Sequence, residues 1–192
     1  MRLFVALDIS AEAIAELSQA LRASSIQAPP GLRWVPESRW HLTLAFLGEI
    51  PDARVGGLCS RIGDVAVAAP PLRLRLAGAG RFGPRVLWVG VAGDIDGLGR
   101  LAHRIESAAH RPGPDLEDRP YRPHLTVARS REGGDLGPLA DSLASVRTSA
   151  WTADRVNLVR SVLGPTACHS TIAHWPMGGD RPDAAVRRGN EG

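Results

Sequence analysis

Apolar and polar positions follow two different periods along this chain. Apolar residues at every second position, or in short unbroken runs, are typical of strands, and apolar residues every three or four positions are typical of helices. On this basis the expected strands are residues 2–8, 32–35, 40–47, 72–77, 85–91, 121–129, 150–162 and 167–175. The expected helices are residues 11–23, 53–68, 95–109 and 135–146.

Short polar residues and glycines mark where these elements begin and end. Ser10, Asp52 and Asp94 each stand just before an expected helix, where such a side chain can cap the first turn. Gly48 is expected to end the third strand, and Gly164 to lie in a hairpin turn between the last two strands.

Strands and helices interleave in this pattern, and several neighbouring strands are too close in sequence for a helical crossover. The prediction is an α+β fold with mostly antiparallel sheets. A chain of 192 residues with 44% hydrophobic residues can form one domain, or two small lobes that share a core. Apolar periodicity stops after Trp175, so we expect a folded domain over residues 1–176 and a disordered tail over residues 177–192.

One short motif occurs twice. His-Leu-Thr followed by an aliphatic residue begins at His41 and again at His124, each time within an expected strand. Residues i and i+2 of a strand share a face, so Thr43 is expected beside His41, and Thr126 beside His124. If the two strands lie side by side, both pairs converge on one cleft.

Two histidines across a cleft suit general acid–base catalysis. A neutral imidazole can take a proton from a nucleophile while an imidazolium gives one to a leaving group, and each transfer typically contributes about 10²–10⁴-fold in rate. The threonine hydroxyls can donate hydrogen bonds to an anionic oxygen. The group expected between them is a phosphoryl group.

Other common site chemistries have little support in the sequence. The motifs have no nearby cysteine or carboxylate set for a metal, and neither a nucleophile elbow nor a cysteine–histidine signature is present. Cys59 and Cys168 are too few for a disulfide framework and are expected to be buried thiols. We therefore expect no metal and no cofactor.

The basic residues are all arginines, in a chain with a net charge of +3. Arginine binds phosphate in a bidentate manner, although a GC-rich genome would also favour arginine over lysine. Arg39, Arg122 and Arg131 flank the motifs and are candidates for RNA phosphate contacts or for a solvated surface. Arg129 lies five residues after His124, so it reaches a phosphate at that histidine only if the strand bends or ends near Ala128.

Four aromatic residues near the motifs can stack on a base or fill the core. These are Trp34, Phe46, Phe82 and Tyr121. A core position is expected for Phe46 in particular, because in a regular strand it would alternate out of phase with His41.

The paired motifs resemble those of the two-histidine (2H) phosphoesterases, and most closely the LigT-like RNA 2′,3′-cyclic phosphodiesterases, also called 2′–5′ RNA ligases. The resemblance covers nearly the whole chain. It rests on RLFVALD at 2–8, LRWVPESRWHLTLAFLGEI at 32–50, RVLWVGV at 85–91 and YRPHLTVAR at 121–129. One departure is His169, at a position before Ile172 where the family usually has tyrosine.

The resemblance implies a fold of two lobes, each a small antiparallel sheet backed by helices, with one motif per lobe facing a shared central cleft. It also implies roles for five residues in opening a ribose 2′,3′-cyclic phosphate to a 2′-phosphate without a metal. His41 would be the proton donor and His124 the proton acceptor, while Thr43, Thr126 and Arg129 would bind the phosphate.

Two alternatives stay open beside this hydrolysis. The same cleft could carry out 2′–5′ RNA ligation, the cleavage of 2′,5′-linked oligonucleotides or the opening of another cyclic phosphate. A non-catalytic RNA-binding module is the second alternative, although it would usually have a denser basic surface than a net charge of +3.

The expected partners are RNA ends or small nucleotide 2′,3′-cyclic phosphates. The sequence shows neither a signal peptide nor an apolar stretch near the roughly 18 residues that a transmembrane helix needs. We therefore expect a cytoplasmic monomer without a membrane partner.

Overall fold

The computed structural model describes residues 1–24, 28–109, 121–162 and 168–179 of the chain. Within them lie two antiparallel sheets. The four-stranded sheet has the order β3-β1-β8-β9, and the five-stranded sheet has the order β2-β6-β5-β4-β7. The α+β class and the antiparallel sheets predicted from the sequence are confirmed.

The strands run over the following residues: β1 Arg2–Leu7, β2 Leu32–Trp34, β3 Leu42–Glu49, β4 Leu72–Phe82, β5 Val86–Gly93, β6 His124–Ser130, β7 Trp151–Ala153, β8 Arg155–Val162 and β9 Cys168–Pro176. The helices are α1 Ala11–Ala23, α2 Asp52–Val67, α3 Ile95–Ala109 and α4 Gly137–Ser142, and a 3₁₀ turn, η1, covers Glu37–Arg39.

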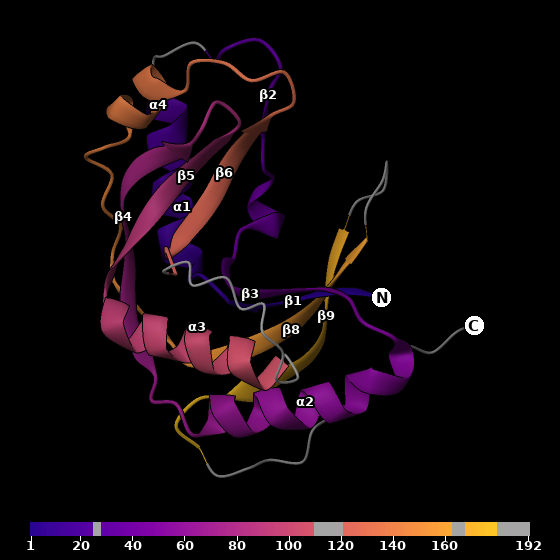
Figure 1. The fold of residues 1–192 in the computed structure, drawn as a ribbon. Helices are drawn as coiled ribbons and strands as arrows, with labels where there is room; N and C mark the ends of the chain where they lie inside the picture. The colour runs from indigo at the N-terminus through magenta and orange to yellow at the C-terminus, as the bar shows by residue number, and fades with distance from the viewer. Residues whose placement is uncertain (25–27, 110–120, 163–167, 180–192) are drawn as a thin grey trace.

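Each sheet is backed by two helices (Figure 1). Helices α2 and α3 pack together and lie on the four-stranded sheet, whereas α1 and α4 lie on the five-stranded sheet. The chain crosses between the lobes repeatedly, because α1 follows a strand of the four-stranded sheet but covers the other sheet, and α3 does the reverse.

One continuous apolar core joins the two lobes. It contains strand residues of both sheets, such as Val5 and Leu125, together with helix residues such as Leu17 and Ile105. Burying this much apolar surface is the main force that holds the sheets in a fixed relation. No helix in the described ranges is long and apolar enough to cross a bilayer.

Several sequence predictions need correction. Residues 150–162 are not one strand: β7 pairs with β4, β8 pairs with β1, and Asp154 between them lies where the chain passes from one sheet to the other. Asp52 is the first residue of α2, whose N-cap is Pro51, while Ser10 does cap α1 by accepting a hydrogen bond from the Ala13 N–H. Gly48 lies within β3, not at its end.

Two further predictions concern the thiols and the chain end. Cys59 is buried as expected, but Cys168 is exposed, because it begins β9, the edge strand of its sheet. The expected turn at Gly164 and residues 180–192 of the expected tail lie outside the described residues.

Candidate active site

Both motif histidines are tethered to a backbone carbonyl two residues upstream. His124 begins β6, and its Nδ1 lies 2.7 Å from the Arg122 carbonyl oxygen. His41 lies between η1 and β3, and a hydrogen bond with the backbone of Arg39 favours its charged form. A carbonyl oxygen can only accept, so Nδ1 of His124 carries the hydrogen and Nε2 of the neutral ring keeps a free lone pair.

A β-bulge follows the first motif. Thr43 is paired with Ala6 and Ala45 with Val5, which leaves Leu44 as an extra residue on β3. Leu44 and Ala45 are both buried as a result, and the next residue, Phe46, returns to the face of Thr43 with 69% of its surface exposed. The predicted core position of Phe46 is therefore wrong, since a bulge shifts the alternation by one residue.

The second motif has a bulge at the same place. Thr126 is paired with Trp88 and Ala128 with Leu87, so Val127 is the extra residue on β6. Val127 and Ala128 are both buried, and Arg129 is exposed on the Thr126 face. In a regular strand Arg129 would lie on the opposite face from His124. The bulge shifts the alternation by one residue and so brings Arg129 to the His124 face.

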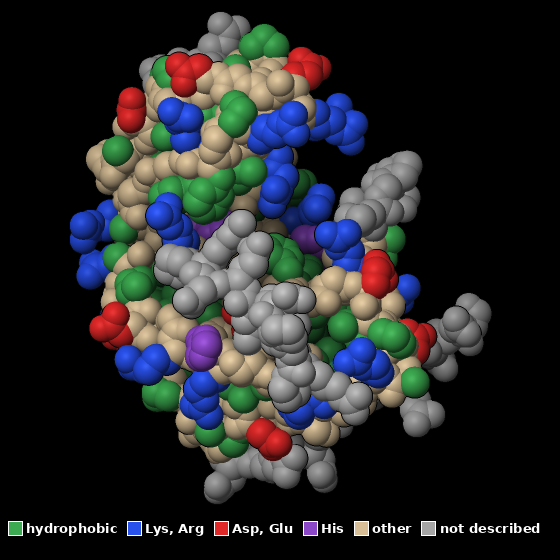
Figure 2. Space-filling model, in the orientation of Figure 1, with side chains coloured by type: hydrophobic (Ala, Val, Ile, Leu, Met, Phe, Trp, Pro, Cys, Tyr) green, Lys and Arg blue, Asp and Glu red, His purple; other side chains and the backbone are tan. Residues whose placement is uncertain are grey.

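The first motif lies close to the segment that leads into the second. The Tyr121 hydroxyl donates a hydrogen bond of 2.8 Å to the Thr43 carbonyl oxygen, and burial raises the pKa of that phenol. Figure 2 shows a hollow that opens on the right of this view, with arginine side chains along its rim and histidine side chains recessed beside it. Tyr121 packs against the core and is therefore a structural residue.

An aromatic ring supports each motif histidine. Phe4 stacks on His41 with ring centroids 4.6 Å apart, and Phe82 meets His124 edge-on at 4.9 Å. Phe82 in turn contacts Trp88, which lies close against Gly80: a Cβ there would be 2.3 Å from the indole. Phe4 and Trp88 belong to the site, although neither stands near a motif in sequence.

A third histidine reaches the first motif from β9. The ring of His169 lies 5.3 Å from that of His41 and 5.0 Å from that of Phe4. Burial, followed by the charge of His169, lowers the pKa of His41 to about 4, while Asp8 acts in the opposite direction. The sequence marked His169 as a departure from related chains, but held no sign that it touches His41.

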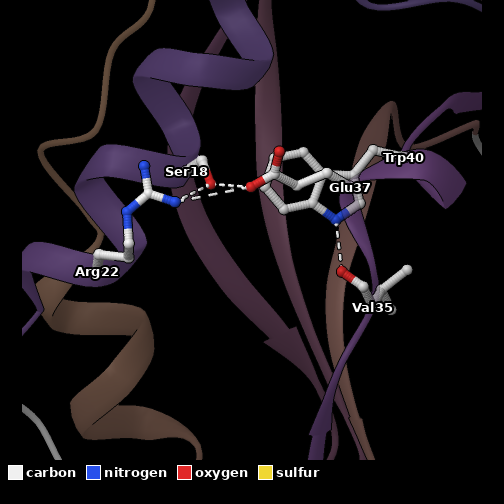
Figure 3. A network of polar contacts seen from close by, with 5 residues as sticks. All are labelled: Ser18, Arg22, Val35, Glu37 and Trp40. Carbon is white, nitrogen blue, oxygen red and sulfur yellow. Dashed lines mark hydrogen bonds and ion pairs between the residues drawn. The ribbon is translucent and has the colours of Figure 1, made fainter.

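A polar network fixes the turn that delivers His41 (Figure 3). The Ser18 hydroxyl of α1 donates to the Glu37 carboxylate of η1, and Arg22 donates a 2.9 Å hydrogen bond to Ser18. Trp40 follows the turn, is buried, and donates its indole N–H to the Val35 carbonyl oxygen at 2.9 Å. These contacts hold the backbone on both sides of Arg39, whose backbone anchors His41.

No group of three or more His, Cys, Asp or Glu side chains in the described ranges is arranged to hold a metal ion. The two motifs and the arginines beside them offer imidazole, hydroxyl and guanidinium groups. Such a set can move protons and stabilise an anion.

Curated proteins named RNA 2′,3′-cyclic phosphodiesterase are similar to this chain. The Escherichia coli K12 protein is 37% identical over 129 residues, which cover 67% of this chain and 71% of the relative. The Thermus thermophilus protein is 32% identical over 179 residues, covering 86% and 84%. The Geobacillus stearothermophilus protein is 31% identical over 191 residues, and this chain spans 97% of its own length but only 60% of that relative.

Solved structures share the fold. E. coli LigT in apo form has a TM-score of 0.74 at 27% identity, with 92% of this chain and 96% of that chain covered. TT0787 of T. thermophilus has a TM-score of 0.73 at 27% identity, with 94% and 100% covered. A family model described as 2′-5′ RNA ligase superfamily matches residues 8–165. With this match over most of its length, the chain belongs to the 2′-5′ RNA ligase superfamily.

Proposed function

We propose that this protein hydrolyses RNA-terminal 2′,3′-cyclic phosphates to 2′-phosphates by metal-free acid–base catalysis. The observation that carries the proposal is the repeated arrangement of a carbonyl-tethered histidine, a threonine and a bulge in both lobes. Relatives of this chain carry the name RNA 2′,3′-cyclic phosphodiesterase, which supports the proposal.

His124 suits the role of general base. Its Nδ1–H is committed to the Arg122 carbonyl, so Nε2 can accept a proton from water as the water oxygen attacks phosphorus. The bond between phosphorus and the ribose 3′ oxygen then breaks, and His41 gives a proton to that oxygen. The net change is the addition of one water molecule.

The remaining polar groups suit the binding of the phosphate. The hydroxyls of Thr43 and Thr126 can donate to its non-bridging oxygens, and the exposed Arg129 can make a bidentate contact. Phe46 is exposed on the Thr43 face and offers an apolar surface on which the terminal base can stack.

The test is an incubation with a short RNA ending in a 2′,3′-cyclic phosphate, in EDTA, beside the His41→Ala and His124→Ala variants. We expect only the wild-type protein to form a 2′-phosphate efficiently, with a loss of about 10²–10⁴-fold in each variant. Activity that persists in the double variant would end this proposal. Adding a second RNA with a free 5′ hydroxyl separates hydrolysis from ligation, because only ligation yields a 2′,5′-linked product.

A further inference from the structure

Three rings, those of Phe4, His41 and His169, form a cluster at the first motif. His169 reaches it from β9, at the opposite edge of the four-stranded sheet from β3. Its ring meets His41 edge-on at 5.3 Å and Phe4 edge-on at 5.0 Å, while Phe4 stacks on His41. Phe4 therefore supports both imidazoles and fixes their separation.

The groups around this cluster do not all favour the same charge state of the two histidines. Nδ1 of His169 is buried and has no hydrogen-bond partner among the described residues. The Arg39 guanidinium acts on both histidines and disfavours their charged forms, whereas the Asp8 carboxylate favours the charged form of His41. Two protonated imidazoles in ring contact beside an arginine would repel each other strongly.

We propose that His169 is a positioning residue for His41, with which it forms a histidine pair. The ring of His169 contacts the edge of the His41 ring and rests on Phe4. When an anion is bound, this pair of histidines carries a single proton. The proposal deepens the function given above and rests on it for the role of His41 as the acid. Without an anion the pair favours its uncharged form, and an arriving phosphate supplies the negative charge that stabilises the proton.

The direction of the titration follows from these contacts. Burial and Arg39 lower the pKa of His169, and burial together with the charge of His169 lowers the pKa of His41. Two groups that interact this closely titrate in two steps, and each apparent pKa is a property of the pair and not of one histidine. Removing the charge at position 169 should therefore make His41 easier to protonate.

The experiment is an NMR titration of the ¹⁵N-labelled imidazoles in the ligand-free protein, compared with His169→Gln. We expect the His41 midpoint to rise by about one pH unit in the variant, since strongly coupled sites shift each other by at least that amount. The backbone amide signals of the five-stranded sheet, in the other lobe, should not move and serve as the internal control.

A second variant separates charge from packing. His169→Phe keeps a ring against Phe4 but removes the titrating nitrogens, so the His41 midpoint should rise there as well. An unchanged His41 midpoint in either variant, once its fold is verified by circular dichroism, overturns the proposal.

Activity measurements distinguish the two proposals. The pH dependence of kcat/KM with the cyclic phosphate RNA should show the limb that reports His41 moving in the same direction as the NMR midpoint. If the midpoint moves but the protein opens no cyclic phosphate, the histidine pair stands and the proposed reaction fails. If the reaction proceeds and the midpoint stays, the reaction stands and the pair fails.

Discussion

A histidine that acts as a general acid must be charged when the reaction needs it, and burial opposes that charge. With a pKa of about 4, His41 is almost entirely neutral at pH 7 in the ligand-free protein. A bound phosphate changes this balance, because a nearby negative charge favours the imidazolium. In the proposed mechanism, the bound phosphate would therefore be needed to charge His41 before it can act as the acid.

Arg129 is the first residue to test at this scale. Arg129→Ala should lower kcat/KM for the cyclic phosphate by about 10²–10³-fold, as the loss of one stabilising donor typically does. Arg129→Lys should keep only part of the wild-type kcat/KM, because lysine cannot make the bidentate contact. Arg54→Ala is the matched control, because Arg54 is an exposed arginine in α2, outside both motifs, and this variant should stay close to wild type. Equal losses at both positions would argue against a specific phosphate contact.

The exposed ring of Phe46 can be tested as a surface for base stacking. Stacking on a base is worth about 1–3 kcal/mol, so Phe46→Ala should lower kcat/KM for RNA by about 5–150-fold. The free energy of unfolding should change little, because the ring is 69% exposed. Urea unfolding checks the second part, and a large loss of stability would indicate that the ring belongs to the core.

At the level of secondary structure, the two bulges determine which residues each strand presents beside its motif histidine. They place the residue five positions after each histidine, Phe46 and Arg129, on the same face as that histidine. The local alternation around His41 and His124 was sufficient to predict the two strands. It could not predict the bulges, because they depend on the register with β1 and β5, which are far away in sequence.

The close contact between Gly80 of β4 and Trp88 of β5 can be tested by substitution. A Cβ at Gly80 would lie 2.3 Å from the Trp88 ring, so Gly80→Ala must displace the indole and, through Phe82, His124. We expect a loss of about 1–3 kcal/mol in the free energy of unfolding, with reduced kcat. Gly99→Ala is the control: Gly99 is in α3 with open space around its Cβ position, and this variant should gain about 0.5–1 kcal/mol.

At the scale of the whole molecule, the sequence predicted the class of fold better than its connections. Residues 150–162 look like one strand because their apolar pattern is nearly continuous, yet the chain changes sheets at Asp154, whose carbonyl accepts a hydrogen bond from the Met177 N–H at 2.7 Å. Likewise, the contact between His169 and His41 depends on the strand order of the four-stranded sheet, in which β9 and β3 are the two edges. Such long-range relations leave no periodic signal in the chain.

The stability of the whole protein should depend on pH through His41. Its folded pKa lies below the unfolded value, so the unfolded chain binds more protons between about pH 4 and pH 6.5, and stability falls as the pH is lowered through that window. From pH 7 to pH 5 this contribution is at most about 2 kcal/mol. His41→Gln should flatten that part of the profile in urea unfolding, and a profile as steep as that of wild type would contradict the low pKa.

Because the chain crosses between the lobes, a single cut in the backbone separates strands that are neighbours in a sheet. A break between α3 and β6 would leave the inner strands β6 and β8 on one fragment and their neighbours β2, β5 and β1 on the other. Neither fragment then holds a complete sheet, although each carries one complete motif. If the proposed activity is correct, the two fragments should each be inactive and should recover activity only when fused partners bring them together, which would make the split protein a reporter of proximity.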